Sequence, residues 1–274
     1  MKIGYLGPEG TFTHQAALKY TKDLKKFELI AFPIITDVLQ AVENGDVDEC
    51  VVPFENSIEG TVTFTIDSLI FDVDVVIEAE IVIPIRHNLV AKKGCKAENL
   101  VKILSHPQAL AQCRKYLDGE YRSVEKIQLG STAGAAKMVS ETGEAWGAIC
   151  TAEAAEAFGL EILEEGIQDE NQNKTRFLVV SKKHNAKPVY EGKTSIVFST
   201  EDKPGELYKI LDIISIWDLN MTKIESRPMK NELGKYVFYV DMESSNAADI
   251  RDAIKMIERK TAFFKHLGTY NTLM

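Results

Sequence analysis

Two polar residues, Thr175 and Arg176, stand where a polar stretch meets an apolar run in the segment NQNKTRFLVV. A positioned Thr hydroxyl can donate a hydrogen bond, and the planar guanidinium of Arg matches the geometry of a carboxylate. Together with the preceding Asn173, this pair indicates a site for an anionic ligand at the mouth of a buried strand. The alternative is structural: Arg176 pairs with a neighbouring Glu, and Thr175 merely begins the strand.

A second polar group follows another apolar run, in the segment VVPFENSIEGTV. Glu55, Asn56 and Ser57 come directly after the predicted strand, and in open α/β sheets ligands bind beyond the carboxyl ends of the strands. The segment therefore predicts part of a ligand site. The alternative is a loop in which Asn56 and Ser57 only satisfy nearby backbone groups.

The segment GPEGTFTHQAA lies between a predicted strand and a predicted helix. It contains neither a Walker A motif nor a G-x-G-x-x-G pattern. We expect Gly10 to let the backbone approach a ligand, the amides of Thr11 and Phe12 to face an anion, and Thr13 to cap the helix. An ordinary strand-to-helix turn is the alternative.

Two further segments, LSHPQALAQC and GSTAGAAKM, each place hydroxyl residues before a helix. Ser105 is expected to cap the first helix, and Ser131 or Thr132 the second, so that free amides of both first turns face the ligand. Gln108 is expected to orient a polar group of the ligand. Plain capping is the alternative for both segments, and a lone histidine such as His106 is more often structural than catalytic.

The elements that must position these residues alternate between short apolar runs and amphipathic stretches over residues 1–181. The first 55 residues or so read β-α-β-α-β, with a helix capped by Thr36 and ended by Gly45. We predict an α/β region of two lobes, roughly 1–77 with 165–181 and 78–164, joined by extended crossings and separated by a cleft.

A polar stretch, residues 182–193, is predicted to be a linker, and residues 194–274 have a different pattern. Strand and helix signals there follow the order β-α-β-β-α-β, which predicts a ferredoxin-like domain.

The composition narrows the classes of function. The formal net charge of −9 argues against binding to nucleic acid or to an anionic membrane surface. No apolar run approaches the roughly 20 residues needed to span a bilayer, and no secretory signal is evident at the N-terminus. The four cysteines lack the spacing of a zinc site, so we expect a cytoplasmic protein with reduced cysteines and without metal.

The polar segments occur in a collinear order that resembles the monofunctional prephenate dehydratases with a C-terminal ACT regulatory domain. The matching motifs are GPEGTFT, VPFENSIEG, SHPQALAQC, STAGAA and NKTRF, followed by DKPGEL and NMTKIESRP. The resemblance covers nearly the whole chain. It implies two lobes similar to type II periplasmic binding proteins, and conversion of prephenate to phenylpyruvate with loss of carbon dioxide and water, without a cofactor.

The resemblance also implies roles for individual residues. Thr175 would be the catalytic hydrogen-bond donor to the departing hydroxyl, and Arg176 would bind a substrate carboxylate or hold the site in place. The remaining residues expected at the site are Ser105 and Gln108 as further catalytic groups, and Thr11, Asn56, Ser57, Ser131, Thr132, Asn173 and Phe177 as substrate-binding groups.

For the ACT domain, the resemblance implies L-phenylalanine as effector, bound where two such domains of a dimer or tetramer meet. The expected contacts are Pro204, Gly205, Glu206, Leu207, Asn220, Glu225, Ser226, Arg227 and Pro228. Glu206 replaces the small residue usual in this turn, which argues against tight phenylalanine inhibition. Two alternatives remain open: an arogenate dehydratase, and a non-catalytic binding protein that senses an amino acid.

Overall fold

The computed structural model describes residues 1–183, 192–230, 234–244 and 246–273. The strands are β1 (Lys2–Leu6), β2 (Glu28–Phe32), β3 (Glu49–Asn56), β4 (Gly60–Thr61), β5 (Val75–Pro84), β6 (Asn88–Ala91), β7 (Lys102–Ser105), β8 (Glu125–Gln128), β9 (Trp146–Cys150), β10 (Glu161–Glu164), β11 (Lys174–Lys182), β12 (Gly192–Ser199), β13 (Asn220–Pro228), β14 (Tyr236–Ser244) and β15 (Phe263–Leu273). The α-helices are α1 (Phe12–Thr21), α2 (Ile35–Asn44), α3 (Thr63–Asp67), α4 (Pro107–Gln112), α5 (Arg114–Glu120), α6 (Thr132–Glu141), α7 (Ala152–Ala157), α8 (Glu206–Ile216) and α9 (Ala247–Lys260).

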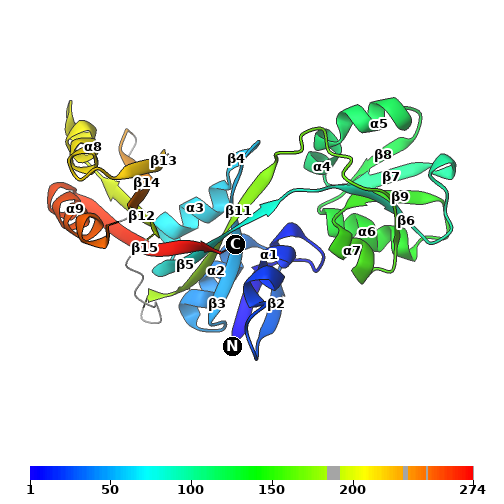
Figure 1. Ribbon diagram of the computed structural model, residues 1–274, viewed down its shortest axis with the longest axis horizontal. Helices are drawn as coiled ribbons and strands as arrows, with labels where there is room; N and C mark the ends of the chain where they lie inside the picture. Colours follow the sequence, from blue (N-terminus) through cyan, green and yellow to red (C-terminus); the bar gives the residue numbers. More distant parts are fainter. Residues whose placement is uncertain (184–191, 231–233, 245, 274) are drawn as a thin grey trace.

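Two sheets organise the chain, as expected for an α/β protein. The larger is ten-stranded, with the order β13-β14-β12-β15-β5-β11-β3-β1-β2 and with β4 paired to β3. The smaller is five-stranded, with the order β10-β6-β9-β7-β8. Figure 1 shows the smaller sheet and helices α4–α7 forming one half of the molecule, with α8 and α9 at the opposite end.

The chain passes twice between the two sheets. All of β5 belongs to the larger sheet, where it pairs with β11 from Val75 to Pro84. The first crossing therefore lies at residues 85–87, several residues later than the boundary near residue 78 that the sequence indicated. The second crossing, between β10 and β11, returns the chain to the larger sheet and places Thr175 at the beginning of β11, between β5 and β3.

Local sequence explains where the first helices begin and end. Gly45 ends α2 in the left-handed conformation, with φ of 81°, as expected. The two predicted N-caps are wrong. Thr11 caps α1, since its side chain accepts a hydrogen bond from the backbone N–H of His14, and Thr13 is buried inside the helix. Ile34 precedes α2 without a side-chain cap, and Thr36 lies within that helix.

The C-terminal unit has the expected order β12-α8-β13-β14-α9-β15. Residues 184–191 of the predicted linker lie outside the described residues, whereas Gly192 and Lys193 already belong to β12. The last strand of the C-terminal unit, β15, extends beyond that unit, because Asn271 to Leu273 pair in parallel with Ala79 to Ile81 of β5. The unit therefore continues the larger sheet, which the sequence did not indicate.

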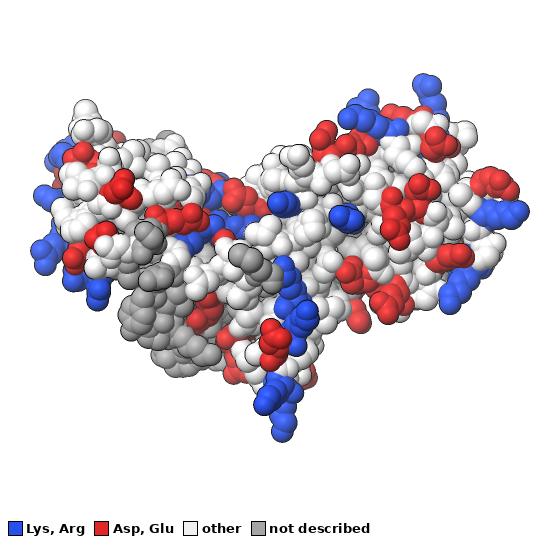
Figure 2. Space-filling view, viewed as in Figure 1, with Lys and Arg blue, Asp and Glu red and all other residues white. Residues whose placement is uncertain are grey.

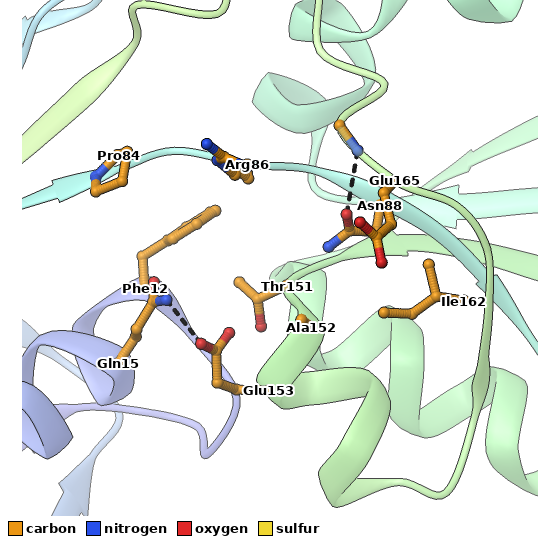
Figure 3. A pocket seen from close by; sticks show the side chains of 11 residues that line it. Phe12, Gln15, Pro84, Arg86, Asn88, Thr151, Ala152, Glu153, Ile162 and Glu165 are labelled. Carbon is orange, nitrogen blue, oxygen red and sulfur yellow. Dashed lines mark hydrogen bonds between the residues drawn. The ribbon is translucent and has the colours of Figure 1, made fainter.

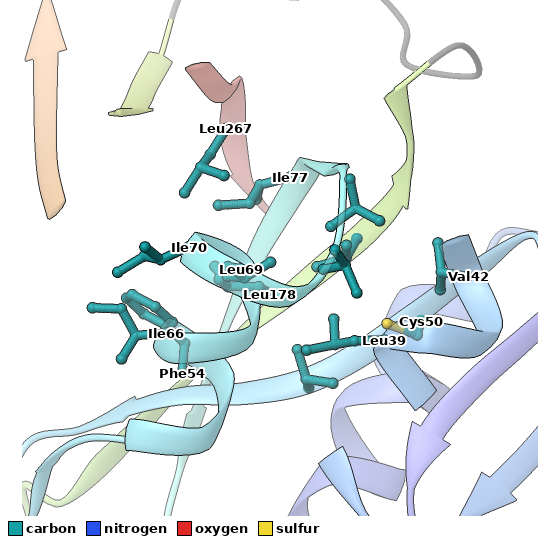
Figure 4. Packing of buried hydrophobic residues seen from close by; sticks show 14 of the residues in the cluster. Leu39, Val42, Cys50, Phe54, Ile66, Leu69, Ile70, Ile77, Leu178 and Leu267 are labelled. Carbon is teal, nitrogen blue, oxygen red and sulfur yellow. The ribbon is translucent and has the colours of Figure 1, made fainter. Parts of the chain in front are cut away.

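A hydrophobic core is shared between the C-terminal unit and the first lobe. It contains Leu39 of α2, Phe54 of β3 and Ile66 of α3 together with Tyr239 and Leu267 of the C-terminal unit, and all five side chains are fully buried. Figure 4 shows Leu267 lying beside Ile77 of β5. Because one core serves both parts, their relative position is held by packing as well as by strand pairing.

The described part of the chain contains no helix that could span a lipid bilayer. The four cysteines are free. On the face shown in Figure 2, Lys and Arg side chains are interspersed with Asp and Glu. No large area of one sign is present on that face.

Candidate active site

A cavity of about 360 Å³ lies between the two lobes and receives most of the polar residues singled out from the sequence. Thr11, Asn56, Thr175 and Phe177 line it from the first lobe, and His106, Gln108, Gln112, Ser131 and Thr132 line it from the second. His87, on the first crossing, completes the polar wall. Its volume falls in the range of small-molecule sites.

Thr175 lies on β11 opposite Asn56 of β3, and its side chain is 8% exposed. The orientation of the Asn56 amide is fixed, because its Oδ1 accepts hydrogen bonds from the backbone N–H groups of Ile58 and Glu59 at 3.0 and 3.1 Å. Its Nδ2 must then point the other way, and it donates to Thr175 Oγ1 at 2.8 Å. Thr175 is an acceptor in this bond, so its hydroxyl proton is left to donate to a ligand in the cavity.

A chain of amides continues from Asn56 across the cleft. Asn56 Nδ2 also donates to Asn173 Oδ1 at 2.8 Å, and Asn173 Nδ2 donates to Gln112 Oε1 of α4 at 3.2 Å. Ser57 Oγ donates to the same Asn173 oxygen at 3.2 Å. Asn173 and Ser57, both expected to touch the substrate, therefore stand behind the cavity wall and hold the groups that line it.

His87 ends this chain. Its Nε2 lies 3.0 Å from Gln112 Oε1, its side chain is 3% exposed, and its ring meets that of Phe12 edge to face. The Nδ1 atom is buried and has no hydrogen-bond partner within the described part of the chain. Burial lowers the pKa of His87, and the bond to Gln112 offsets part of that shift.

His87 and Gln112 were not predicted from the sequence. His87 lies in an apolar crossing with no motif around it, and nothing local marks it. Gln112 could have been predicted, because it follows Gln108 by four residues and therefore lies on the same face of the helix.

Two helix N-termini meet the cavity. Ser131 caps α6, accepting from the backbone N–H of Gly134 at 2.9 Å, as expected. The cap of α4 is His106, whose Nδ1 accepts from the backbone N–H of Gln108 at 3.3 Å. Ser105 neither caps α4 nor lines the cavity: it is fully buried, and its hydroxyl donates to the carbonyl of Ile149. The structure therefore places Ser105 behind the cavity wall, and the expectation that Ser105 caps α4 is wrong.

Arg176 also lies away from the cavity, on the opposite face of β11. Its Nε is 2.6 Å from a carboxylate oxygen of Glu80, its Nη1 is 2.6 Å from Asp241 Oδ2, and its Nη2 donates to the hydroxyl of Tyr270 at 2.7 Å. Neighbouring side chains of a strand point to opposite faces, so Thr175 and Arg176 cannot both face one ligand. In this structure Arg176 therefore pairs with Glu80 and Asp241 instead of lining the cavity, as the alternative of a structural ion pair predicted.

The Gly10 turn contacts the second lobe rather than the cavity. Gly10 has a φ of 82°, and its carbonyl accepts a hydrogen bond from the Thr151 hydroxyl at 2.7 Å. A Cβ at Gly10 would come within 2.8 Å of Ala154 in α7. The close approach expected at Gly10 is therefore made to the other lobe, while Thr11 and Phe12 beside it do line the cavity.

A second cavity, of about 580 Å³, lies on the other side of Phe12. Figure 3 shows Pro84 at the end of β5 and Arg86 on the first crossing, across this space from Thr151 and Glu153. Gln15 of α1 donates to Glu153 at 2.7 Å and so links the lobes there. The sequence did not indicate this cavity.

The residues expected to bind an effector fall into two groups. Gly205, Glu206 and Leu207 line a surface cavity of about 420 Å³ beside α8. The strand β13 instead faces the first lobe: Arg227 makes a bidentate ion pair with Asp67, and Glu225 accepts a hydrogen bond from Thr61. The structure therefore does not bring the 204–207 turn and the 225–228 segment into one cavity within the chain.

Comparison with known proteins gives a consistent result. The prephenate dehydratase family profile matches residues 3–185. The chain is 43% identical over 271 residues to a bifunctional chorismate mutase/prephenate dehydratase of Aquifex aeolicus, covering 98% of this chain and 73% of that protein. It is 41% identical over 270 residues to a prephenate dehydratase of Methanocaldococcus jannaschii, covering 97% and 96%. The crystal structure of prephenate dehydratase from Arthrobacter aurescens in complex with L-Phe is 31% identical, with a TM-score of 0.88 over 99% of this chain and 90% of that one.

Proposed function

The chain belongs to the prephenate dehydratase family, and from that premise we propose that the cavity between its lobes is where prephenate loses carbon dioxide and water to give phenylpyruvate. The supporting observation is the fixed orientation of Asn56, which makes Thr175 Oγ1 an acceptor toward the protein and leaves its proton for the ligand. In this proposal residues 1–181 form the catalytic region, whose two lobes resemble type II periplasmic binding proteins.

The reaction breaks two bonds and forms an aromatic ring. The bond from the ring to its carboxylate breaks, carbon dioxide leaves, and the electron pair moves into the ring. The bond to the ring hydroxyl breaks at the other end, and the departing oxygen leaves as water after taking a proton from solvent. Thr175 stabilises that oxygen with a hydrogen bond as negative charge develops on it. Since aromatisation drives the reaction, a positioned donor and the correct conformer of the substrate supply the catalysis.

Charge for the dianionic substrate comes from groups on the second lobe. The N-terminus of α6, at Ser131 and Thr132, presents backbone N–H groups and the positive end of the helix dipole. His106 accepts from a backbone amide through Nδ1, so in the neutral ring Nε2 carries the proton and is a donor. Gln112 uses its oxygen within the amide chain, which leaves its Nε2 free to donate to the ligand.

The test is turnover of purified protein with prephenate and, separately, with arogenate, which carries an amino group where prephenate has a keto group. We expect phenylpyruvate from prephenate, a kcat at least about 100-fold lower for Thr175→Ala, and substantial recovery in Thr175→Ser, which keeps the hydroxyl. Turnover of arogenate alone would assign the alternative substrate. Undiminished turnover by Thr175→Ala would remove Thr175 from this role.

We further propose that residues 194–274 form an ACT domain through which L-phenylalanine regulates the enzyme. The order of elements supports this, and the Arthrobacter aurescens relative was determined in complex with L-Phe. Because the 204–207 turn and the 225–228 segment lie apart within the chain, the effector site would form between the ACT domains of two copies in a dimer or tetramer. Phenylalanine should then change both activity and particle mass. No change in either over a wide concentration range would refute this regulation.

A further inference from the structure

We propose that His87 is a positioning residue, whose ring holds the side-chain amide of Gln112 in the orientation that leaves the Gln112 N–H groups for the substrate. His87 itself does not touch the substrate in this proposal. The inference rests on the proposed function, because it takes the cavity between the lobes as the substrate site.

The orientation of the Gln112 amide follows from the donors that meet its oxygen. Asn56 Nδ2 donates to Asn173 Oδ1, so the Asn173 nitrogen points the other way and donates to Gln112 Oε1 at 3.2 Å. His87 Nε2 lies 3.0 Å from the same oxygen. A carbonyl oxygen has two lone pairs and can accept both bonds. Because this oxygen is an acceptor, the His87 nitrogen that faces it carries a proton.

The Gln112 nitrogen is the free end of this arrangement. Gln112 lines the cavity, and within the described part of the chain its Nε2 has no hydrogen-bond partner. In the same part of the chain, the fully buried side-chain nitrogen and oxygen atoms without a partner are Gln15 Oε1, His87 Nδ1 and Arg176 Nε. Gln112 Nε2 is not one of them, so it has accessible surface and can donate to a ligand.

The surroundings of His87 fix the ring and leave it one polar contact. Its backbone N–H donates to Gln168 Oε1, and its carbonyl accepts from the backbone N–H of Ile167, both at 2.9 Å. The ring is buried edge to face against Phe12, and burial lowers its pKa, so the ring is neutral near pH 7. Among the described residues, Gln112 is the one hydrogen-bond partner of the ring. His87 therefore acts on the cavity through Gln112.

Gln112 contacts a part of the substrate other than the leaving hydroxyl. Asn56 and Asn173 separate it from Thr175 along the chain of hydrogen bonds, and the proposed function places that hydroxyl at Thr175. The other polar groups of prephenate are two carboxylates and a keto group, which are acceptors already in the free substrate. A donor to such a group binds the substrate as well as the transition state, so its loss raises KM more than it lowers kcat.

The test compares two substitutions of similar length in turnover of prephenate. His87→Gln keeps an N–H group near the position of Nε2, whereas His87→Met has no donor. We expect His87→Met to raise KM about tenfold, and His87→Gln to keep KM within about twofold of the wild type. Equal values of KM in the two variants would overturn the inference.

A double substitution separates positioning from a general structural role. Gln112→Met removes the amide through which His87 acts, so we expect His87→Met to cause no further rise in KM when it is added to Gln112→Met. A purely structural contribution of His87 would instead be additive. The full tenfold rise in the Gln112→Met background would therefore refute the role as a positioning residue.

A measurement on the wild type requires no stable His87→Met protein. Nitrogen NMR of the histidine-labelled protein reports which ring nitrogen carries the proton, and the signal absent from His87→Gln identifies His87. We expect a neutral ring with the proton on Nε2, and a proton on Nδ1 alone would overturn the inference. Failure of the wild type to convert prephenate would refute the proposed function, whereas the NMR result is independent of turnover.

Discussion

Replacement of Arg176 by Met should damage the stability of the protein far more than its affinity for substrate. The guanidinium lies between Glu80 and Asp241, which are 4% and 0% exposed, and it is 4.9 Å from the centre of the Phe54 ring. Met fills much of the same space but leaves Asp241 without its cation. Breaking a buried ion pair in this way costs about 3–5 kcal/mol, which corresponds to a fall in Tm of roughly 6–20 °C.

The assay is thermal and urea unfolding of the variant, together with the KM for prephenate measured well below its Tm. The control is Arg114→Met, because Arg114 pairs with Asp118 on the surface of α5 with side chains 79% and 61% exposed. Such a surface pair contributes about 0.5 kcal/mol or less. Adding Asp241→Asn to Arg176→Met should recover part of the loss, since it removes the uncompensated charge.

One result would refute this reasoning. If Arg176→Met leaves the Tm unchanged and raises the KM for prephenate about 100-fold, then Arg176 binds a substrate carboxylate in the working enzyme, and the ion pairs described above are incidental.

Three further substitutions or conditions test other parts of the structure. Asn56→Asp keeps an oxygen for the Ile58 and Glu59 amides but turns the donor toward Thr175 and Asn173 into an acceptor. We expect kcat to fall about 100-fold and Tm to fall as well, because the buried carboxylate then faces the Asn173 oxygen with no proton between them; an unchanged kcat would contradict the fixed direction of the bond to Thr175. Gly10→Ala should lower the Tm more than Gly94→Ala. Both glycines have φ near 80°, but only a Cβ at Gly10 would meet the other lobe. Equal falls in Tm would show that the two lobes move apart to accommodate the methyl group. Burial alone would raise the pKa of Glu80, but Arg176 and Lys193 lower it, so the unfolded state binds more protons and stability is lost as pH falls below about 4.3. The free energy of unfolding, measured with urea between pH 3 and 6, should depend less on pH in Glu80→Gln than in the wild type. An identical pH dependence in the two proteins would contradict this expectation.

The order of strands and helices could be predicted because it depends on patterns of neighbouring residues in the sequence. Apolar runs and turn residues such as Gly45 mark each element, and residues 1–55 and 194–273 follow the expected orders. The caps were less predictable, since several hydroxyl residues often precede one helix. Thr11 and Thr13 compete for α1, and only the conformation of the backbone shows which side chain reaches the free amides.

The direction of Arg176 could have been predicted, and the contact between His87 and Gln112 could not. Once Thr175 is assigned to the cavity on a strand, the alternation of side chains already sends Arg176 to the other face. The hydrogen-bond partner of the His87 ring is Gln112, which lies 25 residues away in sequence and contacts His87 from the second lobe. The pairing of β15 with β5 is non-local in the same way, because nothing near residue 271 indicates a partner near residue 79.

The two faces of β11 connect the stability of the C-terminal unit to the chemistry of the cavity. Thr175 is held on one face by Asn56, and Arg176 is held on the other by Asp241 of β14 and Tyr270 of β15. The two residues share a peptide unit, so a shift of the C-terminal unit that pulls Arg176 also displaces the Thr175 hydroxyl. A displacement of about 1 Å in a catalytic group can lower a rate about 100-fold. Any kinetic effect of Arg176→Met should therefore appear in kcat, because the groups on the second lobe that bind the ligand stay in place.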